Sequence, residues 1–220
     1  MNLRVLLLVS VIVIVCAGPL FGVKLAESRQ ESELSKWFED TYGIACTQPC
    51  LFGITPGVTR YDDALKMISQ HSETRSMQKG AANSFGSVFG DERFSIMLTQ
   101  TQNGYVGDIT ITNNVDYFTP IVAPDYFKLG QLIAAVGSPS HITLGDYGSS
   151  PDYYFFFEGR LVAQVWNADI SCKIDPQVAY QTLELQNYDS RGSDALPWKG
   201  FARRDKYKYR QPDELSNCLR

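Results

Sequence analysis

The sequence is poor in the residues that most often perform chemistry. Its 220 residues include only two histidines, His71 and His141, and neither is paired at metal-ligand spacing. No serine lies in a nucleophile-elbow pattern, so the sequence does not support a hydrolase triad. The net charge of −4 is small, which argues against nucleic acid as the main partner. We therefore predict no catalytic residue, no metal and no cofactor.

Long apolar runs are also rare, and the one at the N-terminus, residues 5–23, contains no charge. At about 1.5 Å per residue, a helix of this length just spans a hydrocarbon core of roughly 30 Å. It is either a membrane anchor or a signal peptide cleaved before Gly18. Its length favours an uncleaved anchor, and lipidation of Cys16 is disfavoured because Val15 precedes it. In either case we expect the following domain to be extracytoplasmic, on a single-pass membrane protein or secreted if the leader is cleaved.

Four cysteines follow this segment: Cys46, Cys50, Cys172 and Cys218. An even number outside the cytoplasm indicates two disulfides, with three possible pairings. We favour Cys46–Cys50, which closes a small loop, and Cys172–Cys218, which ties the C-terminal tail to the body. Metal binding by Cys46 and Cys50 is disfavoured, because neither histidine is paired at metal-ligand spacing. A redox motif normally has two residues between its cysteines, whereas three separate these.

The body of the chain shows a helix followed by an antiparallel hairpin. Thr59 caps the first predicted helix. Strands 94–99 and 105–112 follow, and Asn103-Gly104 between them is a strong hairpin signal. A separate helix is predicted over about 28–42.

The same order of elements then returns. Apolar residues lie at helical spacing over 129–136, and Gly137-Ser138-Pro139 ends that helix. Strands 153–157 and 161–166 form the second predicted hairpin, and a further strand is expected at 178–185. The sequence thus predicts an α+β fold of two tandem helix-plus-antiparallel-hairpin units after an N-terminal transmembrane or signal segment.

The frequent aromatic residues and the lack of low-complexity stretches predict an ordered body. The predicted segments are a membrane anchor or signal peptide (1–24), a helix and disulfide loop (25–52), a first unit (53–122), a second unit (123–189) and a polar, basic-aromatic C-terminal tail (190–220).

Short motifs in both units resemble a known family. Gly53-Ile54-Thr55-Pro56-Gly57-Val58-Thr59, followed by Ala64-Leu65 and Ile68, resembles the opening of the periplasmic BamE (SmpA/OmlA) domain, where a helix packs on a three-stranded antiparallel sheet. The helix ending at 129–139 resembles one from the same group. The tandem arrangement is similar in outline to the beta-lactamase inhibitor protein. The resemblance implies a protein that works by presenting surfaces, and it assigns no functional residue.

A second resemblance rests on the disulfide loop and the C-terminal region. Cys46-x-x-Pro49-Cys50 joined to 53–59, with Trp198-x-Gly200-Phe201 late in the chain, resembles an uncharacterised family of anchored bacterial extracytoplasmic proteins. That likeness implies the same anchored arrangement.

Aromatic side chains lie on both faces of the predicted strand 153–157. The favoured interpretation is a central strand that is covered on both sides. If one side is open, Tyr153, Phe155 and Phe157, together with Trp166, form the best candidate interaction surface, because aromatic residues dominate interface energetics.

The expected function is a non-enzymatic protein-interaction or envelope-assembly module, held at the membrane by residues 5–23 and bound to a protein partner. One alternative is an envelope hydrolase that uses His71 or His141. Another is a binder of a small or polymeric ligand in a groove between the two units. A pocket that combines a histidine, a carboxylate and a nucleophile favours the enzyme, an exposed aromatic patch favours the interaction module, and an enclosed apolar cavity favours the ligand binder.

Overall fold

The computed structural model describes residues 33–46, 49–80, 86–114, 127–145, 152–166 and 174–201. These residues belong to one compact unit that begins at Glu33. The predicted membrane segment 5–23, Cys172 and Cys218 lie outside them. Within the described ranges, no helix is long and apolar enough to cross a membrane.

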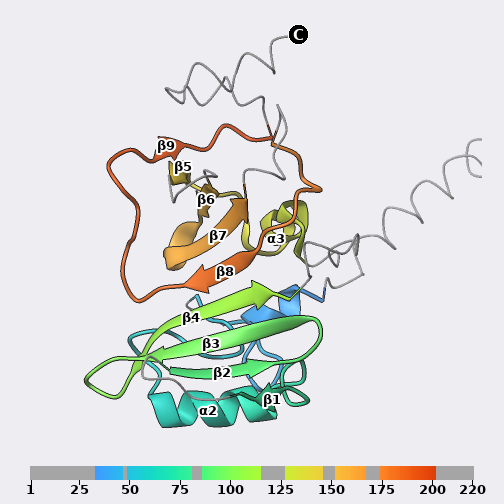
Figure 1. The fold of residues 1–220 in the computed structure, drawn as a ribbon, viewed down its shortest axis with the longest axis vertical. Coiled ribbons are helices and arrows are strands. Elements are labelled where there is room, and N and C mark those ends of the chain that lie inside the picture. The colour runs from blue at the N-terminus through green and yellow to red at the C-terminus, as the bar shows by residue number, and fades with distance from the viewer. Residues whose placement is uncertain are drawn as a thin grey trace, which may run out of the picture. The chain divides into compact units, whose positions relative to one another are not determined.

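Nine strands in the described residues form one antiparallel sheet (Figure 1). The strands are β1 (Gln78–Lys79), β2 (Gly86–Gly90), β3 (Phe94–Gln100), β4 (Val106–Asn113), β5 (His141–Gly145), β6 (Asp152–Phe156), β7 (Leu161–Trp166), β8 (Thr182–Leu185) and β9 (Leu196–Pro197). Their order across the sheet is β1-β2-β3-β4-β8-β7-β6-β5-β9.

This architecture corrects the predicted fold class. The protein is mainly β, and its described residues contain only two α-helices, α2 (Tyr61–Gln70) and α3 (Leu129–Val136), so it is not an α+β pair of tandem helix-plus-hairpin units. The finding that overturns the prediction is the pairing of β8 with β4 on one side and β7 on the other. An unpaired strand edge leaves a row of backbone groups without partners. By pairing on both sides, β8 joins all the strands into one sheet.

Both predicted hairpins and the predicted helix over 129–136 are confirmed, and one predicted helix is wrong. β3 pairs with β4, and β6 pairs with β7, as the hairpin signals indicated. The helix predicted over 28–42 is, within the described residues, only the short 3₁₀ helix η1 (Ser35–Phe38). The Asp40 carboxylate accepts hydrogen bonds from the backbone N–H of Tyr42 and Ile44, at 2.8 and 3.0 Å. Such local bonds give the backbone an alternative to the helix.

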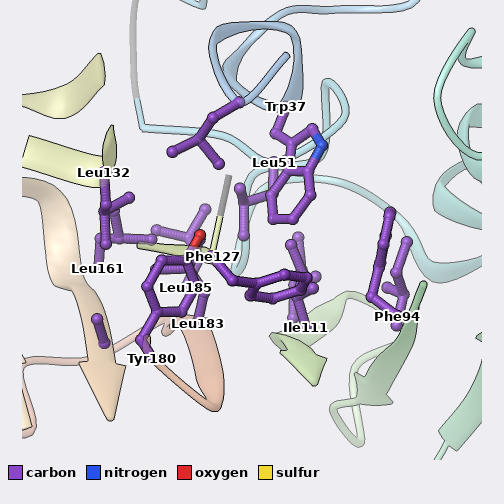
Figure 2. Packing of buried hydrophobic residues seen from close by; sticks show 14 of the residues in the cluster. Trp37, Leu51, Phe94, Ile111, Phe127, Leu132, Leu161, Tyr180, Leu183 and Leu185 are labelled. Carbon is purple, nitrogen blue, oxygen red and sulfur yellow. The ribbon is translucent and has the colours of Figure 1, made fainter. Parts of the chain in front are cut away.

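One face of the sheet carries the hydrophobic core, because apolar and polar residues alternate along the strands. Trp37 lies at the centre of an aromatic group, with ring centroids 4.9 Å from Phe94 and 5.7 Å from Phe127 (Figure 2). Phe127 in turn lies 5.2 Å from Tyr180. Further core residues come from both helices and from β3, β4 and β8: Ala64, Ile68, Ile96, Leu98, Ile109, Ile111, Leu129, Leu132, Leu183 and Leu185.

The opposite face of the sheet is polar. The strand positions between the core residues include Thr110 and Thr112 on β4, Gln164 on β7 and Glu184 on β8, all of them partly exposed. The helices α2 and α3 do not cover this face, because their buried sides pack into the core cluster. The polar face is therefore where a functional site is available.

Candidate functional site: a polar groove on the sheet

The polar face is hollowed over strands β5 to β8, where a groove has a volume of about 490 Å³. Its floor comes from residues that alternate with the core residues of each strand. Its wall is the segment that follows β8. The lining residues are Thr143, Tyr154, Phe156, Val162, Gln164, Glu184, Gln186, Tyr188, Ser190, Gly192 and Asp194.

Register places the floor residues in rows across the sheet. Tyr154 lies opposite Thr143 on β5 and opposite Gln164 on β7, and Gln164 lies opposite Thr182 on β8. The Thr182 hydroxyl donates to Gln164 Oε1 at 2.9 Å, and Gln164 Nε2 donates to Asp152 Oδ2 at 2.8 Å. Gln164 is thus held from both ends of its amide, so this part of the floor is fixed before any ligand binds.

Two hydrogen bonds tie the wall to the sheet. The Thr143 hydroxyl donates to Asp194 Oδ2 at 3.0 Å, and the backbone N–H of Asn187 donates to Asp108 Oδ1 at 3.2 Å. They fasten the segment near both of its ends. The groove is therefore a built feature of the fold, not a gap beside a loose loop.

The fold shifts the pKa of Glu184, an acid that lines the groove. Partial burial raises its pKa, a hydrogen bond with Gln186 opposes the rise, and the Asp108 carboxylate on β4 adds to it. Burial also raises the pKa of Tyr188, with added contributions from Asp108 and Glu184. Gln186 is only 7% exposed, and its Oε1 atom is buried without a hydrogen-bond partner. The groove thus combines a desolvated acid with an unused acceptor.

We predict that Glu184→Gln stabilises the protein at neutral pH. Because the fold raises the pKa of Glu184, the folded chain binds its proton more tightly than the unfolded chain, and stability falls as pH rises from 4.5 through the raised value. The groups that act on Glu184 are Asp108, Gln186 and Tyr188, and neither of its strand neighbours, on β4 or on β7, carries a charge. The variant removes this loss, so its thermal midpoint should exceed that of the wild type by a few degrees at pH 7.

The stability gained by Glu184→Gln should disappear below about pH 4.5. There the wild-type glutamate is protonated, so it carries no charge, like the glutamine of the variant. Thermal unfolding of the full chain across this pH range measures the effect. Glu92→Gln is the matched control, since it removes an exposed glutamate on the turn before β3. A variant that is less stable than the wild type at pH 7 would contradict the prediction.

A second hollow of about 490 Å³ adjoins the groove and shares Phe156, Val162, Gln186 and Ser190 with it. It holds an ion pair between Arg191 and Asp189. Hydrogen bonds from Arg191 lower the pKa of Asp189 to about 2. Arg160, also in this hollow, adopts a positive φ of 68° and donates to the carbonyl of Asn187. Both arginines are therefore engaged outside the groove.

The described aromatic side chains of the predicted interaction surface are buried in the core. Tyr153, Phe155 and Phe157 are at most 5% exposed, so they do not form an open interaction surface. The side chain of Trp166 lies outside the described part of the chain. Tyr154 and Phe156 point to the opposite face, because neighbouring residues of a strand alternate, and they line the groove.

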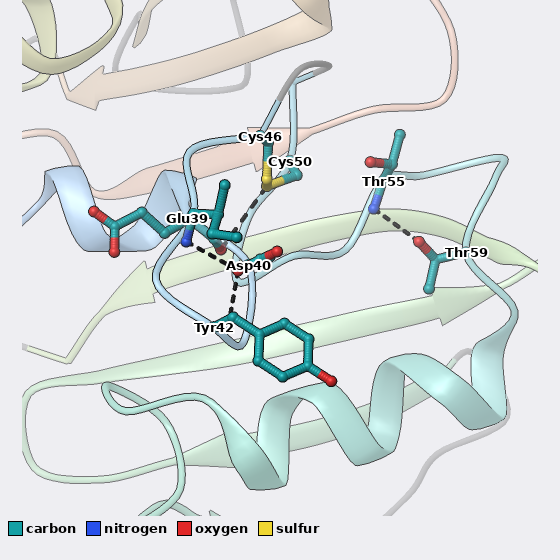
Figure 3. The surroundings of a disulfide bond; sticks show 8 residues. Glu39, Asp40, Tyr42, Cys46, Cys50, Thr55 and Thr59 are labelled. Carbon is teal, nitrogen blue, oxygen red and sulfur yellow. Dashed lines mark hydrogen bonds between the residues drawn. A yellow bond between two sulfur atoms is a disulfide. The ribbon is translucent and has the colours of Figure 1, made fainter.

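The disulfide between Cys46 and Cys50 is present, with the two Cα atoms 6.1 Å apart (Figure 3). It lies beside the turn made by Asp40, and the backbone N–H of Cys46 donates to the Phe38 carbonyl at 3.2 Å. The disulfide and this bond brace one loop, which suits a structural role. The predicted Cys172–Cys218 bond lies outside the described residues.

The two histidines occupy separate places. His71 is buried against Phe52, its Nδ1 accepts the N–H of Glu73 at 3.2 Å, and burial lowers its pKa. His141 begins β5 and is half-buried. The nearby serines bond to backbone carbonyls, Ser69 to Lys66 and Ser140 to Phe156.

Possible metal ligands do not gather in the described part of the chain. It contains no group of three or more His, Cys, Asp and Glu side chains that fits a metal ion.

Sequence reasoning missed Glu184, Gln186 and Tyr188. A signal for Glu184 was present, since Thr182 and Glu184 alternate with Leu183 and Leu185, a pattern typical of a strand with one wet face. Nothing local shows that a groove lies above that face.

Neither a protein-family model nor a curated protein matches the sequence. Among solved structures, a DUF4309 family protein (YjgB) from Bacillus subtilis subsp. subtilis str. 168 is similar over 62% of this chain and 83% of that chain, at 10% identity. The TM-score of 0.33 is too low to carry an argument about fold or function.

Proposed function

We propose that the protein is a non-enzymatic, membrane-anchored extracytoplasmic module that binds a protein partner in the groove on its polar sheet face. The observation that carries the proposal is the groove itself. It is preformed, lined by aromatic, amide and carboxylate groups, and left open by the helices that cover the other face. Binding sites typically combine such concavity with a few fixed polar groups.

Two further features support this proposal. The Cys46–Cys50 disulfide suits an oxidising compartment, in agreement with the predicted leader at 5–23. The groove wall presents Tyr188 with 54% of its surface exposed, and tyrosine is enriched among the residues that dominate protein interfaces. The aromatic contribution expected from Tyr153, Phe155 and Phe157 is therefore replaced by Tyr154, which is partly exposed, and by Tyr188.

Site-specific photocrosslinking in native membranes tests the proposal. A photoreactive amino acid replaces Tyr188 in the full-length protein, and the matched control carries it at Val58, which is 63% exposed and does not line the groove. We expect one adduct of defined mass from position 188, absent from position 58, whose crosslinked peptide maps to a single partner segment. Adducts of equal yield from both positions, or none from position 188, would overturn the proposal.

A further inference from the structure

We propose that the groove binds an arginine side chain of the partner, next to Glu184 and Gln186. This inference rests on the proposed function and names the chemistry that the site selects. The starting point is the unpaired Oε1 atom of Gln186. Buried polar atoms are nearly always hydrogen-bonded, so an unpaired acceptor on a residue that lines the groove favours a ligand that donates a hydrogen bond.

The orientation of the Gln186 amide follows from its neighbour. Gln186 makes a side-chain hydrogen bond to Glu184 that favours the ionised carboxylate. A carboxylate only accepts, so the amide must present its NH₂ group to Glu184. Its oxygen is then the atom without a partner. The Glu184 carboxylate and the Gln186 oxygen together leave acceptors for a ligand.

The charge of the groove selects a cation. Glu184 and Asp194 line it, and none of the described lining residues is a lysine or an arginine. The Asp108 carboxylate acts on Glu184 from β4 and strengthens the negative field. A partly desolvated carboxylate gains most from a ligand that both neutralises it and donates hydrogen bonds. A cationic donor therefore fits better than a neutral one.

Arginine fits better than lysine because of the shape of the lining. A guanidinium group is planar, donates from several N–H groups and stacks on aromatic rings, whereas an ammonium is a compact point charge. Tyr154, Phe156 and Tyr188 supply aromatic groups in the groove, and Gln186 lies next but one to Glu184 along the chain. The two nearby arginines of this chain do not line the groove.

A ligand-observed NMR titration of the purified full-length protein in non-ionic detergent tests the assignment. The probes are N-acetyl-arginine amide, the isosteric but neutral N-acetyl-citrulline amide, and N-acetyl-lysine amide. We expect saturable binding of the arginine probe and at least about tenfold weaker binding of citrulline. Glu184→Gln should weaken the arginine probe by at least about tenfold, whereas Glu92→Gln should leave it unchanged.

Several outcomes would overturn the inference. They are equal affinity for arginine and citrulline, equal affinity for arginine and lysine, or wild-type affinity in a folded Glu184→Gln variant. Thermal unfolding confirms that this variant is folded. The photocrosslink from position 188 separates the two proposals. If the adduct persists in Glu184→Gln, the groove remains the partner site and the assignment of an arginine ligand is rejected. If no adduct forms but the arginine probe still binds, only the proposed protein partner is rejected.

Discussion

Trp37→Ala should lower the free energy of unfolding by about 3–5 kcal/mol, the range measured for deleting large buried aromatic side chains. Trp37 is 2% exposed, and its ring lies 4.9 Å from Phe94 and 5.7 Å from Phe127. Its carbonyl also accepts the N–H of Phe52 at 2.6 Å. The ring therefore fills the space between the first described segment, β3 and the entry to α3, and its loss leaves a cavity that three elements surround.

Urea unfolding of the full chain, followed by circular dichroism, measures this effect. Tyr42→Ala is the matched control, because Tyr42 belongs to the same segment but is 87% exposed. Exposed substitutions usually change stability by no more than about 0.5 kcal/mol. If the two variants lost similar stability, the segment from Glu33 to Cys46 would not be packed on the sheet as described.

The strand pairs that the sequence predicted correctly are those with a local signal. Asn103-Gly104 specifies the turn between β3 and β4, and Gly104 adopts the positive φ of 78° that favours glycine. The pairing that decides the fold class is not local. Ile111 lies opposite Leu183, far along the chain, and a strand's pattern shows which face is buried without showing which strand lies beside it. The structure therefore has one sheet where the sequence predicted two separate units.

The site was missed for a related reason. Strand 153–157 carries large aromatic residues at every position, so no polar residue marks the wet face. Tyr153 and Phe155 lie in the core, and Tyr154 and Phe156 line the groove. In β8 the alternation of leucine with Thr182 and Glu184 does mark the wet face. The depth of the groove, however, depends on the segment after β8, whose fold follows from bonds to Thr143 and Asp108.

Leu183→Ala should lower the free energy of unfolding by about 2–5 kcal/mol, as is typical for a buried leucine. Leu183 is fully buried and lies opposite Ile111 on β4 and Ala163 on β7, so it packs at the point where the strands of both predicted units meet. A cavity there weakens the one pairing that joins them. Urea unfolding measures the loss, and Thr182→Ser, a small change on the opposite face of β8, is the control.

The same strand separates stability from binding, because its faces carry different residues. Leu183→Ala should unfold more easily while its folded form binds the arginine probe within about twofold of the wild type, since Leu183 does not line the groove. Glu184→Gln should do the opposite, gaining stability at neutral pH and losing the probe. If a folded Leu183→Ala variant lost the probe as well, the floor would depend on core packing, and the fixed geometry inferred for Gln164 would not hold.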